Sequence, residues 1–178
     1  MFTHSSIAKP NNPESNRRLI SWLAELNEHI NKSMAAQEAG AAEEVPNPFQ
    51  PDFQIQNRQG LINAKAYLEK AIVELLAAND CAHQCQKLWP TGQNVLQKLI
   101  LGIELFSKAY RLQIQVREIL MQPDPVPRQL KRLEQLMAEG RKNAERGDSL
   151  FMESISQIEQ ATGYHFVWET HADDEPPI

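Results

Sequence analysis

Two cysteines and a histidine fall within five residues, in the run CAHQC: Cys81, His83 and Cys85. Thiolates four residues apart share one face of a helix and could bind a single zinc ion. His83 would point to a different face, and the sequence has no CxxC or HxxxH pair to complete a tetrahedral site. We therefore expect no metal site, and two ordinary cysteines that are buried or half-buried.

A second candidate for chemistry is a basic stretch. Residues 126–147 carry six Lys and Arg against the acids Glu134, Glu139 and Glu145, whereas residues 148–178 carry seven acids and no Lys or Arg. The basic residues are Arg128, Lys131, Arg132, Arg141, Lys142 and Arg146. Six such cations could contact phosphates. The net charge of −5 and the interleaved acids favour a solvated helix face instead, since opposite charges at these spacings pair along a helix. The basic and acidic stretches could also pair with each other or present two faces to a partner.

Motifs of catalysis are missing from the sequence. It contains no GxSxG, HExxH, phosphate-binding glycine loop or dinucleotide fingerprint. Glu104 is the most unusual acid, because its neighbours are apolar, and Lys108 four residues later is its expected partner. We expect no catalytic residue, no cofactor and no small-molecule substrate, and hence a protein that is not an enzyme.

Composition limits the fold and the compartment. A chain of 178 residues fits one domain, and with 7% aromatic residues its core must be built mainly of aliphatic side chains, which suits helix packing. The N-terminus has no apolar signal region, and the longest apolar stretch, Leu99–Phe106, is far short of the ~20 residues that span a bilayer. Two cysteines suit a reducing compartment. These features predict a cytoplasmic protein without membrane insertion.

Apolar residues at helical spacing predict helices over about 13–37, 61–87 and 93–121, and a further helical region from about 128. Because the 95–106 segment is apolar nearly all round, we expect the third helix to be central and buried on every side. Gly147 falls in the apolar seam of the last region, where a small residue would allow two backbones to approach closely. A break at 146–148 would give a fifth helix, and we slightly favour it. The predicted fold is all-α: a four- to five-helix bundle around a long central helix, with an extended Pro-rich linker and a disordered acidic C-terminal tail.

The remaining segments organise this domain. We expect a flexible arm at 1–12, a single helical domain at 13–168 that includes the linker 40–60, and a disordered tail at 169–178. Within the linker, Phe49 and Phe53 could pin it across the bundle or dock on a partner. Residues 164–168, which end in Trp168, should form an extended segment packed on the bundle.

The sequence therefore predicts a non-enzymatic protein-interaction module: a subunit of a larger assembly, an adaptor, a chaperone or an inhibitor of another protein. The expected partner is another protein or a second copy of the chain. The alternative is a helical nucleic-acid-associated subunit that uses the basic 128–146 segment. The candidate partner-binding residues are Phe49, Phe53, Arg128, Lys131, Arg132, Arg141, Lys142, Arg146 and Trp168.

Overall fold

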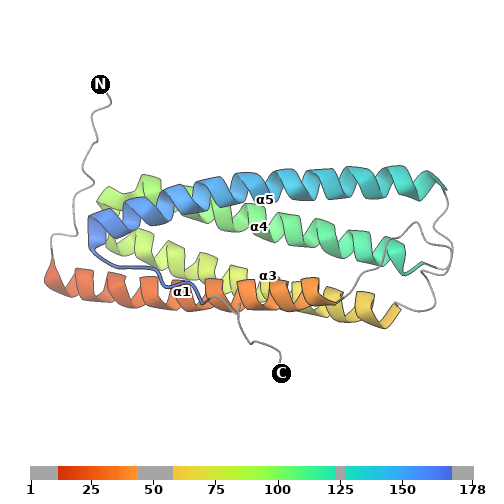
Figure 1. Ribbon diagram of the computed structural model, residues 1–178. Helices are drawn as coiled ribbons and strands as arrows, with labels where there is room; N and C mark the ends of the chain where they lie inside the picture. Colours follow the sequence, from red (N-terminus) through yellow and green to blue (C-terminus); the bar gives the residue numbers. More distant parts are fainter. Residues whose placement is uncertain (1–11, 44–57, 123–126, 170–178) are drawn as a thin grey trace, which may run out of the picture.

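The protein folds as a bundle of four long helices (Figure 1). The computed structural model describes residues 12–43, 58–122 and 127–169. The elements are α1 (Pro13–Ala42), α3 (Arg58–Leu88), the short 3-10 helix η1 (Pro90–Gly92), α4 (Gln93–Leu120) and α5 (Pro127–Thr162). Within these ranges no strand is present, which confirms the predicted all-α class.

The ends of the helices follow the signals in the sequence. The side chain of Asn12 caps α1 by accepting a hydrogen bond of 2.9 Å from the backbone N–H of Glu14, and Pro13 occupies the first helical position, where its missing N–H is not needed. Trp89 is fully buried at the turn between α3 and α4. The predicted ranges of the helices are thereby confirmed to within a few residues at most ends, with α1 extending furthest beyond its prediction.

Two antiparallel hairpins make up the bundle. α1 packs along α3, α4 packs along α5, and the two hairpins meet chiefly where α3 contacts α4. Each helix contributes fully or almost fully buried side chains to a shared core, among them Leu23, Leu75, Leu99 and Ile158. The fourth side of the bundle, between α1 and α5, is built differently.

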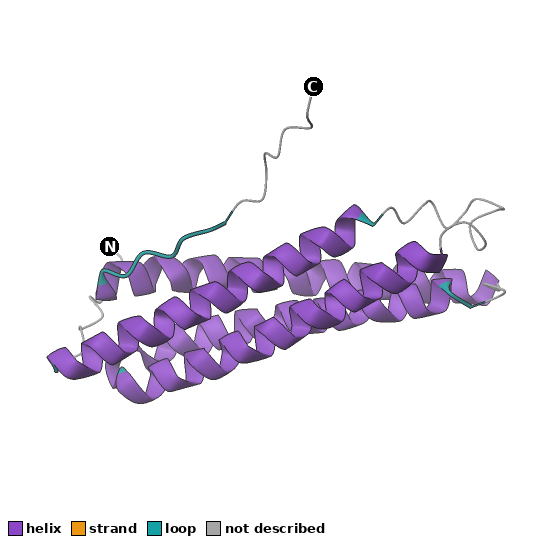
Figure 2. Ribbon diagram, turned by 90° about the horizontal axis from the view of Figure 1, so that it is seen from below, coloured by secondary structure: helices purple, strands orange, loops and turns teal. Residues whose placement is uncertain are grey.

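A segment that we call the strap, residues 163–169, lies along this fourth side (Figures 1 and 2). Gly163, with φ of +76°, reverses the chain after α5, in a conformation that glycine adopts at little cost. The amide groups of Asn27 and Asn31 in α1 donate hydrogen bonds of 3.1 and 2.9 Å to the carbonyl oxygen of Val167. The backbone N–H of Phe166 donates to Oε1 of Glu159 at 2.8 Å. The predicted extended segment packed on the bundle is confirmed.

The favoured break at 146–148 is wrong, because α5 is continuous from Pro127 to Thr162. Tertiary packing explains why Gly147 lies inside a helix. A Cβ atom at Gly147 would lie 3.1 Å from the carbonyl oxygen of Gly102 in α4, and a Cβ atom at Gly102 would lie 3.1 Å from the carbonyl oxygen of Gly147. The two glycines therefore mark a close crossing of α4 and α5, as the seam position of Gly147 predicted.

Two expectations about the third helix are also wrong. α4 shares the inner position with α3, since each of them packs against two helices, and it is not buried on every side: Leu101 is 36% exposed, and Glu104 is exposed. Because Glu104 is exposed, its charge is solvated and needs no ion pair with Lys108. Lys108 instead forms an ion pair of 3.0 Å with Glu139 of α5.

Several predicted features lie outside the described residues: most of the arm, residues 44–57 of the linker with Phe49 and Phe53, and residues 170–178 of the tail. In the part of the chain that is described, no helix combines the length and the apolar character needed to cross a membrane.

Candidate functional site

An apolar groove lies between α1 and α5, at the point where the strap ends. This part of the groove has a cavity volume of about 360 Å³. Its floor contains Leu75, Phe106 and Tyr110, and α1 and α5 form its walls. Trp168 closes one end, where its ring lies 5.8 Å from that of Phe151 and 6.0 Å from that of Phe166. We call this part the Trp168 end.

A second hollow of about 500 Å³ follows along α4 and α5. On α4 the lining residues continue in steps of three and four from Phe106 and Tyr110 to Gln113, Arg117 and Leu120. On α5 they continue in the same steps from Met152 and Asp148 to Ala144, Arg141 and Met137. Residues at this spacing share one helix face, so the two hollows lie in line along α4 and α5, while α1 lines only the first of them. We refer to the two hollows together as the groove. We call its second part the arginine end.

Three methionines line this groove with their side chains open to solvent. Met34 is 38% exposed, Met137 is 54% exposed and Met152 is 49% exposed. Methionine is flexible and polarisable, and it is over-used at surfaces that bind apolar ligands of varied shape. Met137 therefore faces the groove and not the core.

Two arginines give the apolar groove a positive end. Nη1 of Arg117 donates a hydrogen bond of 3.2 Å to the carbonyl oxygen of Gln113, while its buried Nε has no hydrogen-bond partner in the described part of the chain. Burial lowers the pKa of the Arg117 guanidinium, because desolvation disfavours the charged form. Among the described residues, neither Arg117 nor Arg141 forms an ion pair with a carboxylate. This end of the groove is therefore suited to a ligand that carries acidic groups beside apolar ones.

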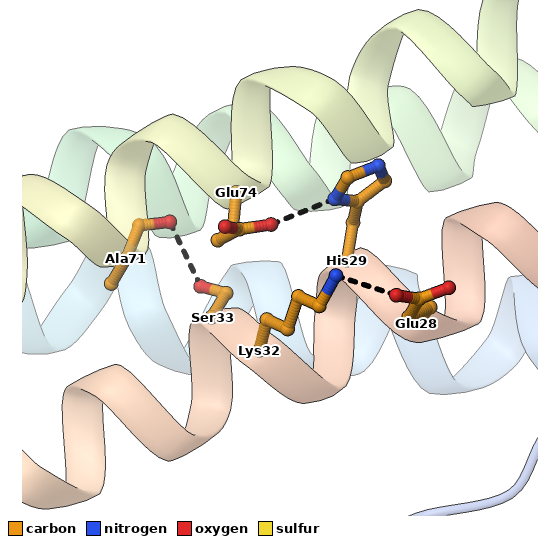
Figure 3. A network of polar contacts seen from close by, with 6 residues as sticks. All are labelled: Glu28, His29, Lys32, Ser33, Ala71 and Glu74. Carbon is orange, nitrogen blue, oxygen red and sulfur yellow. Dashed lines mark hydrogen bonds and ion pairs between the residues drawn. The ribbon is translucent and has the colours of Figure 1, made fainter.

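Polar contacts hold α1 against α3 behind the groove (Figure 3). Nδ1 of His29 and Oε2 of Glu74 are 2.7 Å apart, and the buried hydroxyl of Ser33 donates to the carbonyl oxygen of Ala71 at 3.0 Å. Lys32 is different, because it pairs with Glu28 on the same helix. The two contacts between helices fix the rotation of α1, and with it the positions of Ser33 and Met34 in the groove.

The structure separates the predicted basic cluster. Lys131, Arg132, Lys142 and Arg146 are exposed on the outer side of α5, since eleven residues make about three helical turns and bring Lys142 above Lys131. Arg141 is also exposed, but it lines the groove on another side of α5. The side chain of Arg128 lies outside the described residues. Of the predicted partner-binding residues whose side chains the structure describes, Arg141 and Trp168 are the two that line the groove.

The two cysteines are free and buried, as predicted. Burial raises the pKa of the Cys81 thiol, and it raises that of Cys85 to about 12. Thiols in this state are poor nucleophiles, because the reactive form is the thiolate. Within the described ranges, no three His, Cys, Asp or Glu side chains are grouped so that they could hold a metal ion.

Sequence reasoning missed most of the groove. Its methionines fit an apolar helical period, so periodicity could not distinguish them from core residues. Arg117 gave no distinguishing signal either, because it lies in the mixed run QVREIL directly before Glu118. Tyr110 is also mostly buried, and burial raises its pKa to about 12, so its hydroxyl is a neutral group of the groove floor.

Comparison of this chain with models of protein families, with curated protein sequences and with solved structures finds no match.

Proposed function

We propose that this protein is a non-enzymatic interaction module that binds a segment of another protein in the groove between α1 and α5. The observation that carries the proposal is the combination of exposed methionines with two arginines along one apolar groove. Isolated exposed apolar side chains are normal on a protein surface, but three along one groove, Met34 and Met152 in its first hollow and Met137 in its second, favour a binding site.

The chemistry of the groove defines the partner segment. Apolar side chains would fill the Trp168 end, where Phe106, Phe151 and Trp168 provide aromatic surface. A Glu or Asp farther along the segment would meet Arg117 and Arg141, which supply charge-assisted hydrogen bonds. Folding already removes part of the water around the Arg117 guanidinium, so an acid placed there would interact with it more strongly than with an arginine on an open surface.

Selection of short random peptides displayed on phage tests this proposal. We expect the selected peptides to combine apolar residues with Asp or Glu. Their affinity should fall tenfold or more, about 1.4 kcal/mol, for the variants Met137→Asp and Arg141→Glu. Val73→Asp is the matched control, because Val73 is 63% exposed on α3 and lies outside the groove. Equal binding by Met137→Asp and Val73→Asp would refute the groove as the binding site.

The nucleic-acid alternative keeps one observation in its favour: Lys131, Arg132, Lys142 and Arg146 are all exposed on α5. Glu134 and Glu145 are exposed on the same helix and weaken this positive surface, which is why we place it second. If these four cations contact phosphates, the logarithm of the affinity for double-stranded DNA should fall with the logarithm of salt concentration at a slope of about −3.6. A gel-shift titration at several salt concentrations measures this slope, and absence of binding at low salt would end this alternative.

A further inference from the structure

The groove has a potential occupant in the same chain. The strap already fills the first part of the side between α1 and α5, and Trp168 lies at the mouth of the open part. Residues 170–178 follow directly after the last described residue, Glu169, and they carry Asp173, Asp174 and Glu175. We propose that this acidic segment binds in the groove of its own molecule, with its carboxylates at Arg117 and Arg141, and competes there with the partner segment.

The direction of the strap supports this proposal. The backbone N–H of Phe166 donates a hydrogen bond to the side chain of Glu159, and Trp168, two residues later, packs on Phe151. The strap therefore advances towards the N-terminal end of α5, antiparallel to that helix. Arg141 lies ahead on the same course, on the groove side of α5.

The distances along the groove agree with the spacing of the acids. Arg141 precedes Phe151 by ten residues of helix, about 15 Å, and Arg117 follows Phe106 by eleven residues, about 16 Å. Extended chain covers up to about 3.3 Å per residue, so Asp173 to Glu175 can reach roughly 16 to 23 Å beyond Trp168. An extended segment would thus bring its acids level with both guanidinium groups.

The order of charges fits as well. Asp148, the acid of the groove, lies at the Trp168 end. The residues that would pass it are Thr170, His171 and Ala172, none of which is acidic. The three acids come later, where the groove carries Arg117 and Arg141. Asp148 would repel the three acids at the entrance of the groove, and Arg117 and Arg141 would attract them farther along. These interactions would favour the alignment in which the acids lie beside the two arginines.

Site-specific photo-crosslinking of the full chain tests the proposal. A benzophenone amino acid in place of Ala172 should crosslink, within one molecule, to α4 between Tyr110 and Leu120 or to α5 between Met137 and Met152, as identified by mass spectrometry. The charge-neutral variant Asp173→Asn/Asp174→Asn/Glu175→Gln should lower this yield by roughly fivefold or more, because two charge-assisted contacts are lost. The control Asp80→Asn/Glu104→Gln removes two exposed acids outside the groove and should leave the yield unchanged.

Crosslinks to the outer faces of the helices, crosslinks between two copies, or an unchanged yield in the charge-neutral variant would each overturn the proposal. Competition with a partner rests on the proposed function, and the two can fail separately. If both hold, the charge-neutral variant should bind the selected peptides several times more tightly than the natural chain. If the charge-neutral variant binds the selected peptides as the natural chain does, and no crosslinks to the groove form, then binding of the acidic segment in the groove is refuted and the partner site is not. If crosslinks to the groove form but the phage selection yields no binding peptide, then the proposed partner site is refuted and binding of the acidic segment is not.

Discussion

The close crossing of α4 and α5 gives a sharp prediction for a pair of glycines in one helix. Alanine is favoured over glycine in a helix interior by roughly 1 kcal/mol, and this gain applies equally to Gly140 and Gly147. The surroundings of the two positions differ. A Cβ atom at Gly140 would meet its nearest neighbours at 3.8 Å, which is ordinary van der Waals contact, whereas one at Gly147 would lie 3.1 Å from the carbonyl oxygen of Gly102 and 3.3 Å from Cβ of Leu105.

The neighbours of Gly147 cannot yield independently, because one is the backbone of α4 and the other is attached directly to it. Overpacking of this kind costs typically about 1–3 kcal/mol. We therefore expect Gly140→Ala to raise the free energy of unfolding by up to about 1 kcal/mol, and Gly147→Ala to leave it unchanged or lower it by up to about 2 kcal/mol. The difference between the two variants, about 1–3 kcal/mol, isolates the steric contribution, since the helix propensity is common to both.

Urea denaturation followed by far-ultraviolet circular dichroism measures both variants, provided that the slope with denaturant stays constant. Gly102→Ala should behave like Gly147→Ala, because its Cβ would meet the opposite side of the same crossing at 3.1 Å. In the double variant Gly102→Ala/Gly147→Ala the changes in unfolding free energy should not add. If the helices move apart to accommodate one methyl group, the same movement makes room for the other. Equal stabilisation by Gly140→Ala and Gly147→Ala would refute the close approach of the two backbones.

Three further outcomes follow from other parts of the bundle. Gly92→Ala would place a Cβ atom in steric overlap with the buried Trp89 ring, so it should lower the unfolding free energy by about 2 kcal/mol or more and change the near-ultraviolet circular dichroism of that ring. Gly163→Ala has free space but a φ of +76°, so it should cost only about 1–2 kcal/mol in a denaturant titration. Because burial raises the pKa of Cys85 to about 12, the folded state holds this proton more tightly, and stability should fall as the pH rises above the ordinary thiol pKa of about 8.5. Between pH 8 and pH 10 Cys85 should contribute a loss of about 2 kcal/mol. This contribution is measured as the difference between the natural chain and Cys85→Ala, since Cys81, whose pKa burial also raises, contributes to both.

The helices could be predicted because their signals are local. Prolines at 13, 90 and 123 limit them, and the apolar period between those limits is regular. The continuity of α5 could not be predicted in the same way. Gly147 followed by Asp148 resembles a helix end followed by a cap, and only the nearby backbone of α4 explains the glycine inside a helix.

The site was predictable only in fragments. Arg141 and Trp168 were recognised by residue type, but 27 positions separate them, and their meeting depends on the chain reversal at Gly163. The basic cluster was identified as one feature because its members are close in sequence. These residues lie at different angles around α5, so they point to different sides of the helix. Which of them faces the groove depends on which side of α5 packs against α4.

The strap has a further consequence for the order in which the molecule folds and opens. The contacts of each helical hairpin join segments that are near in sequence, whereas the bond from Asn27 to Val167 closes a separation of 140 residues. The strap should therefore dock after both hairpins have formed, and it should be the first unit to detach in native-state hydrogen exchange. Each detachment would expose the part of the side between α1 and α5 that the strap covers, while the four helices stay folded. The open groove would then lengthen along α1 without any crossing of the global unfolding barrier.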